Sequence, residues 1–195
     1  MRNIVFHKET KTFHLYNEEI SYIMCVLENG HMGQLYYGKR IHDKPDFSYL
    51  VEKCGRPMTS YIFEGDRSFS LEHIRQEYPV YGTTDYRHPA IEIMQENGSN
   101  ISEFKYVGYE ILKGKPSLKG LPATYTESEE EAETLKIILK DSLTGAKLTL
   151  LYTIFSKGSA IARSAHICNE GEKVLHLQTM MSLNLDLPDK DYVWM

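Results

Sequence analysis

The chain has 195 residues, a size that suits one globular domain or part of a larger protein. Hydrophobic residues make up 42% of it and charged residues 25%, which excludes an intrinsically disordered tail. The 22 basic and 27 acidic residues give a net charge of −5, which argues against nucleic acid and against an anionic membrane surface as partners.

The cysteines and the N-terminal residues indicate a compartment. Cys25, Cys54 and Cys168 are too scattered for a disulfide framework or a zinc site, and an odd count fits a reducing environment. Charged residues return near the N-terminus before an apolar signal region can form. We therefore expect a cytoplasmic protein. The eight histidines show no metal-ligand spacing, so neither a metal nor a cofactor is expected.

The first half of the chain begins with a predicted hairpin and continues into an irregular stretch. Strand-like runs at 20–27 and 32–37 flank Asn29-Gly30, a pair that favours a type I′ turn. Residues 38–88 show little alternation and are expected to form a long excursion. Within it, a short helix over 70–77 is predicted, because Ser70 can act as its N-cap.

The second half is dominated by alternating apolar and polar residues. A second Asn-Gly hairpin is predicted at Asn97-Gly98, between runs at 90–96 and 101–107, and a third turn at Thr144-Gly145. The run 148–155 is apolar on much of both faces, 161–167 alternates weakly, and 174–187 keeps a period of two. Many strands without βα units predict an antiparallel sandwich.

The acidic segment 126–133 has two local readings. Thr126 and Glu129 have capping-box spacing, which slightly favours a solvated helix over a charged edge strand. Five glutamates in eight residues also fit a solvated face that binds no ligand.

The loop 76–90 is the most unusual segment in composition, with three tyrosines beside an aspartate, an arginine and a histidine. Aromatic faces such as that of Tyr81 stack on sugars, and Asp85 and Arg87 can grip hydroxyl groups. Alternatively, Asp85 and Arg87 satisfy buried loop backbone while the tyrosines pack. No Gly-x-Ser-x-Gly motif or phosphate loop is present, and spacing selects no catalytic pair among the 27 acidic residues.

Nine blocks of sequence carry a resemblance to a known family. They share their order along the chain and read KTFHL at 11–15, FSLEH at 69–73, QEYP at 76–79, YGTTD at 81–85, KGKP at 113–116, GLPATY at 120–125, EAETL at 131–135, IARSA at 161–165 and MSLNLD at 181–186. The chain resembles, over nearly all 195 residues, the N-terminal domain of bacterial α-galactosidases (melibiases) of glycoside hydrolase family 36.

The resemblance implies an all-β fold, an antiparallel β-supersandwich similar to the galactose mutarotase-like sheets. It favours an edge strand over residues 127–133. In the family this domain precedes a TIM barrel that carries both catalytic aspartates of a retaining mechanism. We therefore expect residues 1–195 to form a truncated N-terminal domain, incomplete at its C-terminal end, with no catalytic residue. The exposed strand edges expected there favour self-association.

The resemblance also implies partners and one site residue. The parent enzyme would act on α-galactoside oligosaccharides of the melibiose and raffinose type, would pack this domain on its own barrel, and is expected to be a homo-oligomer. Family members can lend residues from this domain to a neighbouring subunit's sugar pocket. Arg67 occupies the place of such an arginine, and Glu52 lies near the place of an acidic partner, but Arg67 also fits a solvated loop. A stand-alone carbohydrate-binding module and an interaction domain without a ligand are the alternatives.

Overall fold

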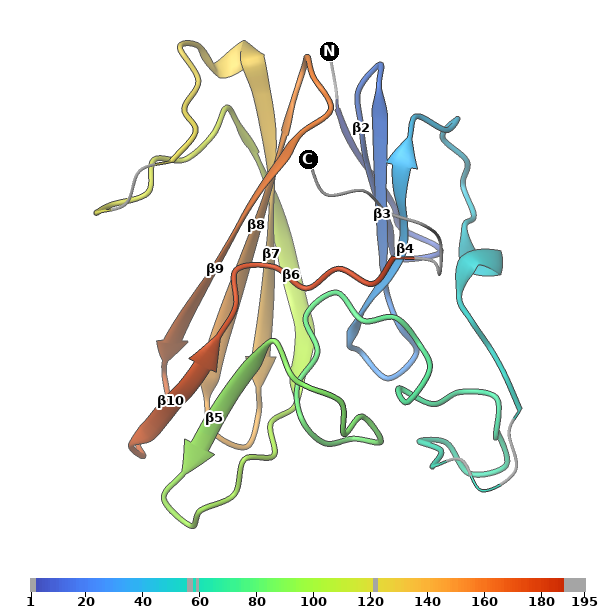
Figure 1. Cartoon of the computed structure of the whole chain (residues 1–195), viewed down its shortest axis with the longest axis vertical. Helices are drawn as coiled ribbons and strands as arrows, with labels where there is room; N and C mark the ends of the chain where they lie inside the picture. Colours follow the sequence, from blue (N-terminus) through green and yellow to red (C-terminus); the bar gives the residue numbers. More distant parts are fainter. Residues whose placement is uncertain (1–2, 56–57, 59, 121–122, 188–195) are drawn as a thin grey trace.

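The computed structural model describes residues 3–55, 58, 60–120 and 123–187, and strands form its architecture (Figure 1). The strands are β1 (Ile4–His7), β2 (Thr12–Tyr16), β3 (Ile20–Val26), β4 (Met32–Lys39), β5 (Ile91–Gln95), β6 (Phe104–Lys113), β7 (Ala132–Asp141), β8 (Ala146–Phe155), β9 (Ile161–Asn169) and β10 (Leu175–Met180). Two short 3-10 turns, Ser48–Leu50 and Glu129–Glu131, complete the described elements.

The strands build two facing sheets of four strands each. One sheet has the order β1-β2-β3-β4 and the other β6-β7-β8-β9, while β5 and β10 pair with each other. All these pairings are antiparallel. The main core contains buried side chains from both four-stranded sheets and from β5. The predicted all-β antiparallel sandwich is confirmed.

Strand β8 turns one of its two faces toward this core. Its even-numbered side chains, Leu148, Leu150 and Tyr152 among them, are buried between the sheets. Most of its odd-numbered side chains are partly exposed, although Thr153 is buried. Burial of both faces, which the apolar run predicts, is therefore only partly observed.

Two of the three predicted turns join neighbouring strands. Asn29-Gly30 connects β3 with β4, and Thr144-Gly145 connects β7 with β8. The first is not a type I′ turn, because Gly30 has a φ of +88° but Asn29 is not among the residues with positive φ. The Gly30 amide donates to the Leu27 carbonyl at 2.8 Å, so a tight turn ends in a left-handed glycine.

The hairpin predicted at Asn97-Gly98 is wrong. The turn itself forms, since the Gly98 amide donates to the Gln95 carbonyl at 2.9 Å. The chain then leaves β5, whose partner is β10, eighty residues further along the sequence. Ile101 lies outside β6, which starts at Phe104. Local turn chemistry therefore identified the turn but not the strand pairing.

The helix predicted over 70–77 is also wrong. Ser70 accepts the Glu72 amide through its side chain at 3.3 Å, and one turn forms. The Glu77 amide then donates to the Met32 carbonyl at 2.8 Å, and the Arg75 carbonyl accepts the Gln34 amide at 3.0 Å. Pairing with β4 draws this part of the chain out of a helical path.

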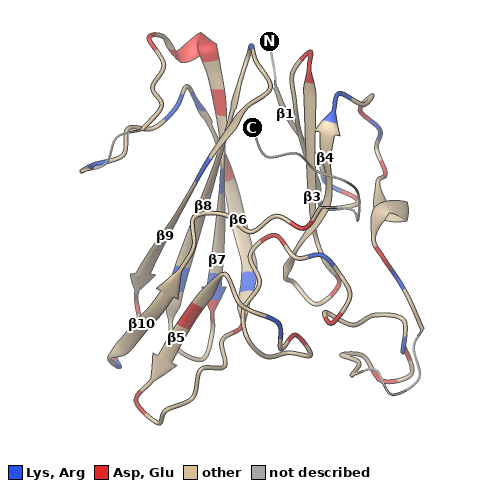
Figure 2. Cartoon of the chain, in the orientation of Figure 1, with Lys and Arg blue, Asp and Glu red and all other residues tan. Residues whose placement is uncertain are grey.

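Residues 126–133 form neither a regular helix nor an edge strand. Glu129–Glu131 make a 3-10 turn, and β7 begins directly after it at Ala132. Because β7 lies between β6 and β8, it is an interior strand of its sheet. Most of the acidic run precedes the strand and stands at one end of the sheet (Figure 2).

The long strand predicted over 174–187 is shorter than its alternation suggests. β10 ends at Met180, and residues 181–187 run on as an irregular segment toward β4 (Figure 1). Side chains fasten this segment to the domain, since Arg163 donates to the Asn184 carbonyl at 3.0 Å and Asn184 donates to the Gln76 carbonyl at 3.1 Å. Leu177 and Leu183 remain exposed, so period two does not correspond to a buried face here.

A second hydrophobic cluster lies apart from the main core. It joins side chains of β3 and β4 to the irregular stretch through buried residues that include Phe47, Phe69, Leu71 and Ile74. The excursion is therefore packed on the domain by apolar contacts. The described part of the chain has no helix with the length and hydropathy needed to cross a membrane.

Candidate functional site

The loop between residues 79 and 90 turns sharply at Gly82–Asp85. The Gly82 amide donates to the Asp85 carbonyl at 2.7 Å, and the Asp85 amide donates back at 3.0 Å. The central residues Thr83 and Thr84 have φ values of +50° and +71°, which defines a type I′ turn. Two consecutive β-branched residues are rare in this region of backbone space, so the turn is strained.

Contacts on one side of the turn offset this strain. The Thr84 hydroxyl accepts the Leu71 amide at 3.1 Å and lies 3.5 Å from the Ser70 hydroxyl. The left-handed conformation of Thr84 thus joins the loop to the 70–77 segment.

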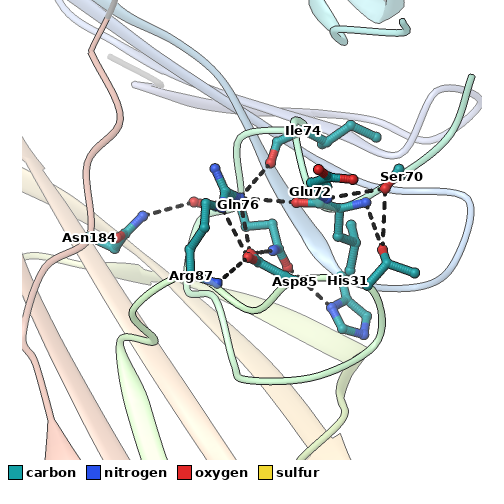
Figure 3. Close-up of polar contacts among 10 residues, drawn as sticks. His31, Ser70, Glu72, Ile74, Gln76, Asp85, Arg87 and Asn184 are labelled. Atoms are coloured by element: carbon teal, nitrogen blue, oxygen red, sulfur yellow. Dashed lines mark hydrogen bonds and ion pairs between the residues drawn. The ribbon is translucent and has the colours of Figure 1, made fainter. Parts of the chain in front are cut away.

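A buried carboxylate organises the base of the loop (Figure 3). Asp85 is 1% exposed and accepts the Gln76 side-chain amide at 2.5 Å. It also pairs with Arg87, whose Nε donates to Oδ1 and whose Nη2 donates to Oδ2, both at 2.9 Å. Arg87 further donates to the carbonyls of Leu71 and Ile74 at 3.0 and 3.2 Å.

Asp85 and Arg87 are therefore brought together, and their contacts lie within the domain. The hydrogen bond to Asp85 raises the pKa of Arg87. The arrangement matches the packing alternative, in which the pair satisfies loop backbone. The Arg87 side chain is 46% exposed, and only that exposed part remains open to a ligand.

The tyrosines of the loop divide into two kinds. Tyr78 is buried, and its hydroxyl donates to the Met181 carbonyl. Tyr81 and Tyr86 are exposed by 38% and 63%, with ring centroids 5.3 Å apart in an edge-to-face contact. The strained turn thus exposes the Tyr81–Tyr86 pair to solvent on the same loop that contains the hydrogen-bonded Asp85–Arg87 pair.

Arg67 and Glu52 lie elsewhere, in the excursion. Both residues are exposed, and neither side chain enters a hydrogen bond or ion pair among the residues that the structure describes. Arg67 directly follows a tight turn in which the Asp66 amide donates to the Phe63 carbonyl at 3.2 Å. The structure therefore shows no contact that joins Arg67 to the Asp85–Arg87 pair.

A buried ion pair between the two sheets was missed from the sequence. Glu77 is completely buried, and its carboxylate lies 2.6 Å from a terminal nitrogen of Arg163 on β9. The Tyr22 hydroxyl donates to it at 2.8 Å and the Tyr152 hydroxyl at 2.9 Å. The partners come from β3, β8, β9 and the irregular stretch, so no spacing rule could have joined them.

Burial and charge act against each other in this pair. Burial raises the pKa of Glu77, while the Arg163 guanidinium and the two tyrosine hydroxyls oppose that rise. Burial alone would lower the pKa of Arg163, but the Glu77 carboxylate raises it. The Glu77 carboxylate is enclosed by Arg163, Tyr22 and Tyr152, so it has no open position for a substrate.

The described residues contain no group of three or more His, Cys, Asp or Glu side chains that could hold a metal ion. The loop carboxylate of Asp85 and the inter-sheet carboxylate of Glu77 are both enclosed by internal partners, so neither is placed for acid–base chemistry on a substrate.

Comparisons with known proteins agree on one family. Residues 30–195 match the model of the glycosyl hydrolase family 36 N-terminal domain. The α-galactosidase AgaA of Geobacillus stearothermophilus is 41% identical over 192 residues, which cover 98% of this chain and 26% of that protein. The α-galactosidase Mel36A of Lactobacillus acidophilus is 34% identical and covers 97% of this chain and 26% of its own length.

Solved structures give the same result. The crystal structure of the α-galactosidase from Lactobacillus brevis superposes with a TM-score of 0.90 and 37% identity, over 95% of this chain and 25% of that one. A variant of AgaA in complex with raffinose gives a TM-score of 0.84 and 42% identity, over 89% of this chain and 24% of its own. The chain thus spans about a quarter of these relatives. With its fold and most of its length matched, the chain belongs to the glycosyl hydrolase family 36 N-terminal domain family.

Proposed function

We propose that this chain is the non-catalytic N-terminal domain of a cytoplasmic α-galactosidase. The parent enzyme hydrolyses terminal α-galactosyl residues of melibiose- and raffinose-type oligosaccharides by a retaining mechanism. Its catalytic aspartates lie in a separate barrel domain. The observation that carries the proposal is the match over 95% of the chain to a solved α-galactosidase that is about four times longer.

The domain contributes subunit contacts and one wall of the substrate cleft. In this proposal the enzyme is a homo-oligomer, and Arg67 reaches a neighbouring subunit's sugar pocket. The exposure of Arg67 and its lack of a partner among the described residues support this role. Tyr81 and the exposed part of Arg87 are the loop residues available for a further contact with a sugar.

The exposed apolar residues of the C-terminal third support association. Val174, Leu177 and Leu183 are exposed by 48% or more, and β9 forms an edge of its sheet. We propose that the parent enzyme covers this region with its remaining domains or subunits, because apolar edges left open promote self-association.

An activity assay tests the proposal. The natural polypeptide that carries this chain is expected to hydrolyse an aryl α-galactoside, whereas the 195-residue chain alone is expected to show no turnover. Turnover by the chain alone that survives purification and is lost on mutation of one aspartate would overturn the non-catalytic assignment. A full-length polypeptide without α-galactosidase activity would overturn the parent activity.

The exposed Tyr81–Tyr86 pair supports one alternative, a stand-alone carbohydrate-binding module. Galactose-dependent quenching of tyrosine emission, lost in Tyr86→Ala but kept in Tyr125→Ala, would favour it. Tyr125 is the matched control because it is an exposed tyrosine outside the loop.

A further inference from the structure

A chain of polar side chains crosses the sheet β1-β2-β3-β4. The Ser21 hydroxyl lies 2.9 Å from Nε2 of His14, and Nδ1 of His14 lies 2.7 Å from Oδ1 of Asp43. Nε2 of His7 lies 2.9 Å from the same oxygen of Asp43. One carboxylate oxygen thus joins histidines from β1 and β2 to the segment that follows β4.

The distances are those of a serine–histidine–aspartate triad, but the arrangement cannot act as one. Ser21 and His14 are both completely buried, so no substrate carbonyl can reach the hydroxyl. The Ser21 oxygen already accepts the Ile41 amide at 3.0 Å. Its partners therefore point to an anchoring role.

The hydrogen-bond pattern fixes the proton on His14. Because ionised Asp43 only accepts, Nδ1 of His14 must carry a hydrogen, and Nε2 of the neutral ring then accepts the Ser21 hydroxyl. If His14 gains a proton, Nε2 becomes a donor, and the Ser21 hydroxyl can no longer donate its hydrogen to the ring. The acceptor left for it is the Ile41 carbonyl, 3.5 Å distant.

The anchored segment is the root of the excursion. The Ile41 amide is held by Ser21, the Pro45 carbonyl accepts the Thr10 hydroxyl at 3.1 Å, and buried Phe47 packs edge-to-face on His14 at 5.4 Å. The chain then continues toward Arg67. Loss of the Asp43 contacts would free one end of this excursion.

We propose that Asp43 is a positioning residue that latches residues 40–50 to the sheet through His14 and His7, and that acidification opens this latch. The consequence for catalysis rests on the proposed function, in which the excursion presents Arg67 to a sugar. The latch itself rests only on the contacts within this chain.

The charges around His14 set the direction of the pH dependence. Burial lowers the pKa of His14 from its ordinary value of 6.5, Asp43 opposes this, and the Arg40 cation acts in the same direction as burial. Tyr16 and Phe47, the other rings against it, are not cationic. The contribution of neutral His14 to stability is therefore complete above pH 6.5. It is lost as the pH falls from 6.5 through the lower pKa that His14 has in the folded protein.

Amide exchange in the natural polypeptide that carries this chain tests the latch. Protection of peptides from 40–50, corrected for intrinsic rates, is expected to fall between pH 7.5 and 5.5 by up to about tenfold, because pH 5.5 is one unit below the ordinary pKa of histidine. Asp43→Ala should lower the protection of this segment at both pH values, while the contacts of Ser21, Thr10 and Phe47 remain. Asp46→Ala is the control, since Asp46 is exposed and its contacts are with Ser48, whose amide it accepts at 2.7 Å, so exchange should change at Ser48 alone.

Peptides from β7 and β8 report whether each variant is folded. If these peptides lose protection in Asp43→Ala, that variant has unfolded and His7→Gln is measured in its place. His7 is nearer the surface, and its loss should weaken the protection of 40–50 only partly. Protection that is flat with pH in the wild type, or unchanged in Asp43→Ala, would overturn the proposal.

Activity separates this proposal from the proposed function. In a polypeptide with α-galactosidase activity, Asp43→Ala should raise KM several-fold with a smaller change in kcat. It should also shift the acid limb of the dependence of KM on pH. Asp46→Ala should change neither. An inactive polypeptide that still shows the exchange pattern would refute the α-galactosidase and leave the latch standing.

Discussion

The sheet β6-β7-β8-β9 and the irregular stretch from residue 40 to residue 90 satisfy their backbone hydrogen-bonding groups in different ways. In the sheet, backbone groups pair with one another along registers of nine residue pairs each. In the irregular stretch, the side chains of Asp85, Arg87 and Thr84, of which only Asp85 is buried, take over that pairing. The first solution leaves a period in the sequence, and the second leaves only isolated polar residues.

The two regions meet at the Glu77–Arg163 pair, so its loss should give the largest effect. Arg163→Ala leaves the buried Glu77 carboxylate without its cation, and we expect a loss of about 3 to 5 kcal/mol in the free energy of unfolding, measured by urea denaturation. Lys136→Ala breaks a more exposed pair with Glu110 and should cost about 1 kcal/mol or less.

A companion variant shows whether the charge is the cause. Glu77→Gln combined with Arg163→Met removes both charges and should recover part of the lost stability. Equal losses in Arg163→Ala and Lys136→Ala would mean that the buried pair does not hold the two regions together.

The sheet region depends on apolar packing, and a core truncation should have the next largest effect. Leu148→Ala removes a completely buried side chain and should cost about 2 to 5 kcal/mol by urea denaturation. Leu143→Ala in the neighbouring turn, where the side chain is 80% exposed, should change stability by about 0.5 kcal/mol or less. Similar losses in the two variants would contradict the assigned facing of β8.

The irregular stretch contains strain, so a substitution there should give a small gain. Thr83→Gly relieves a positive φ at a residue whose side chain has no hydrogen bond among the described residues. It should raise the free energy of unfolding, measured by urea denaturation, by about 0.5 to 1 kcal/mol. Thr84→Gly also loses the bond to the Leu71 amide and should give no gain. A destabilised Thr83→Gly protein would show that the turn is not strained.

Sequence alone predicted the fold class and the local turns. Alternation located β8 and β9, and turn chemistry joined β3 to β4 and β7 to β8. The partner of β5 could not be predicted, because β10 lies eighty residues away and a turn reports only on its own neighbours. The helix expected over 70–77 failed for a related reason, since pairing with β4 outweighed a local cap.

The candidate site was predictable in composition but not in geometry. The crowding of Tyr81, Asp85 and Arg87 in one loop identified a segment with a special structure. Whether such polar side chains face a ligand or their own backbone depends on burial, which the sequence does not contain. The Glu77–Arg163 pair and the Asp43 cluster join distant segments and left no local signal.

The size of the native polypeptide tests the central claim most directly. An antibody raised against this chain should detect, in an extract of source cells, one band several hundred residues longer than 195. Such a band is expected for the N-terminal domain of an α-galactosidase, because this chain covers about a quarter of its relatives. A single band at 22.6 kDa would contradict the account and make a stand-alone β module the better description.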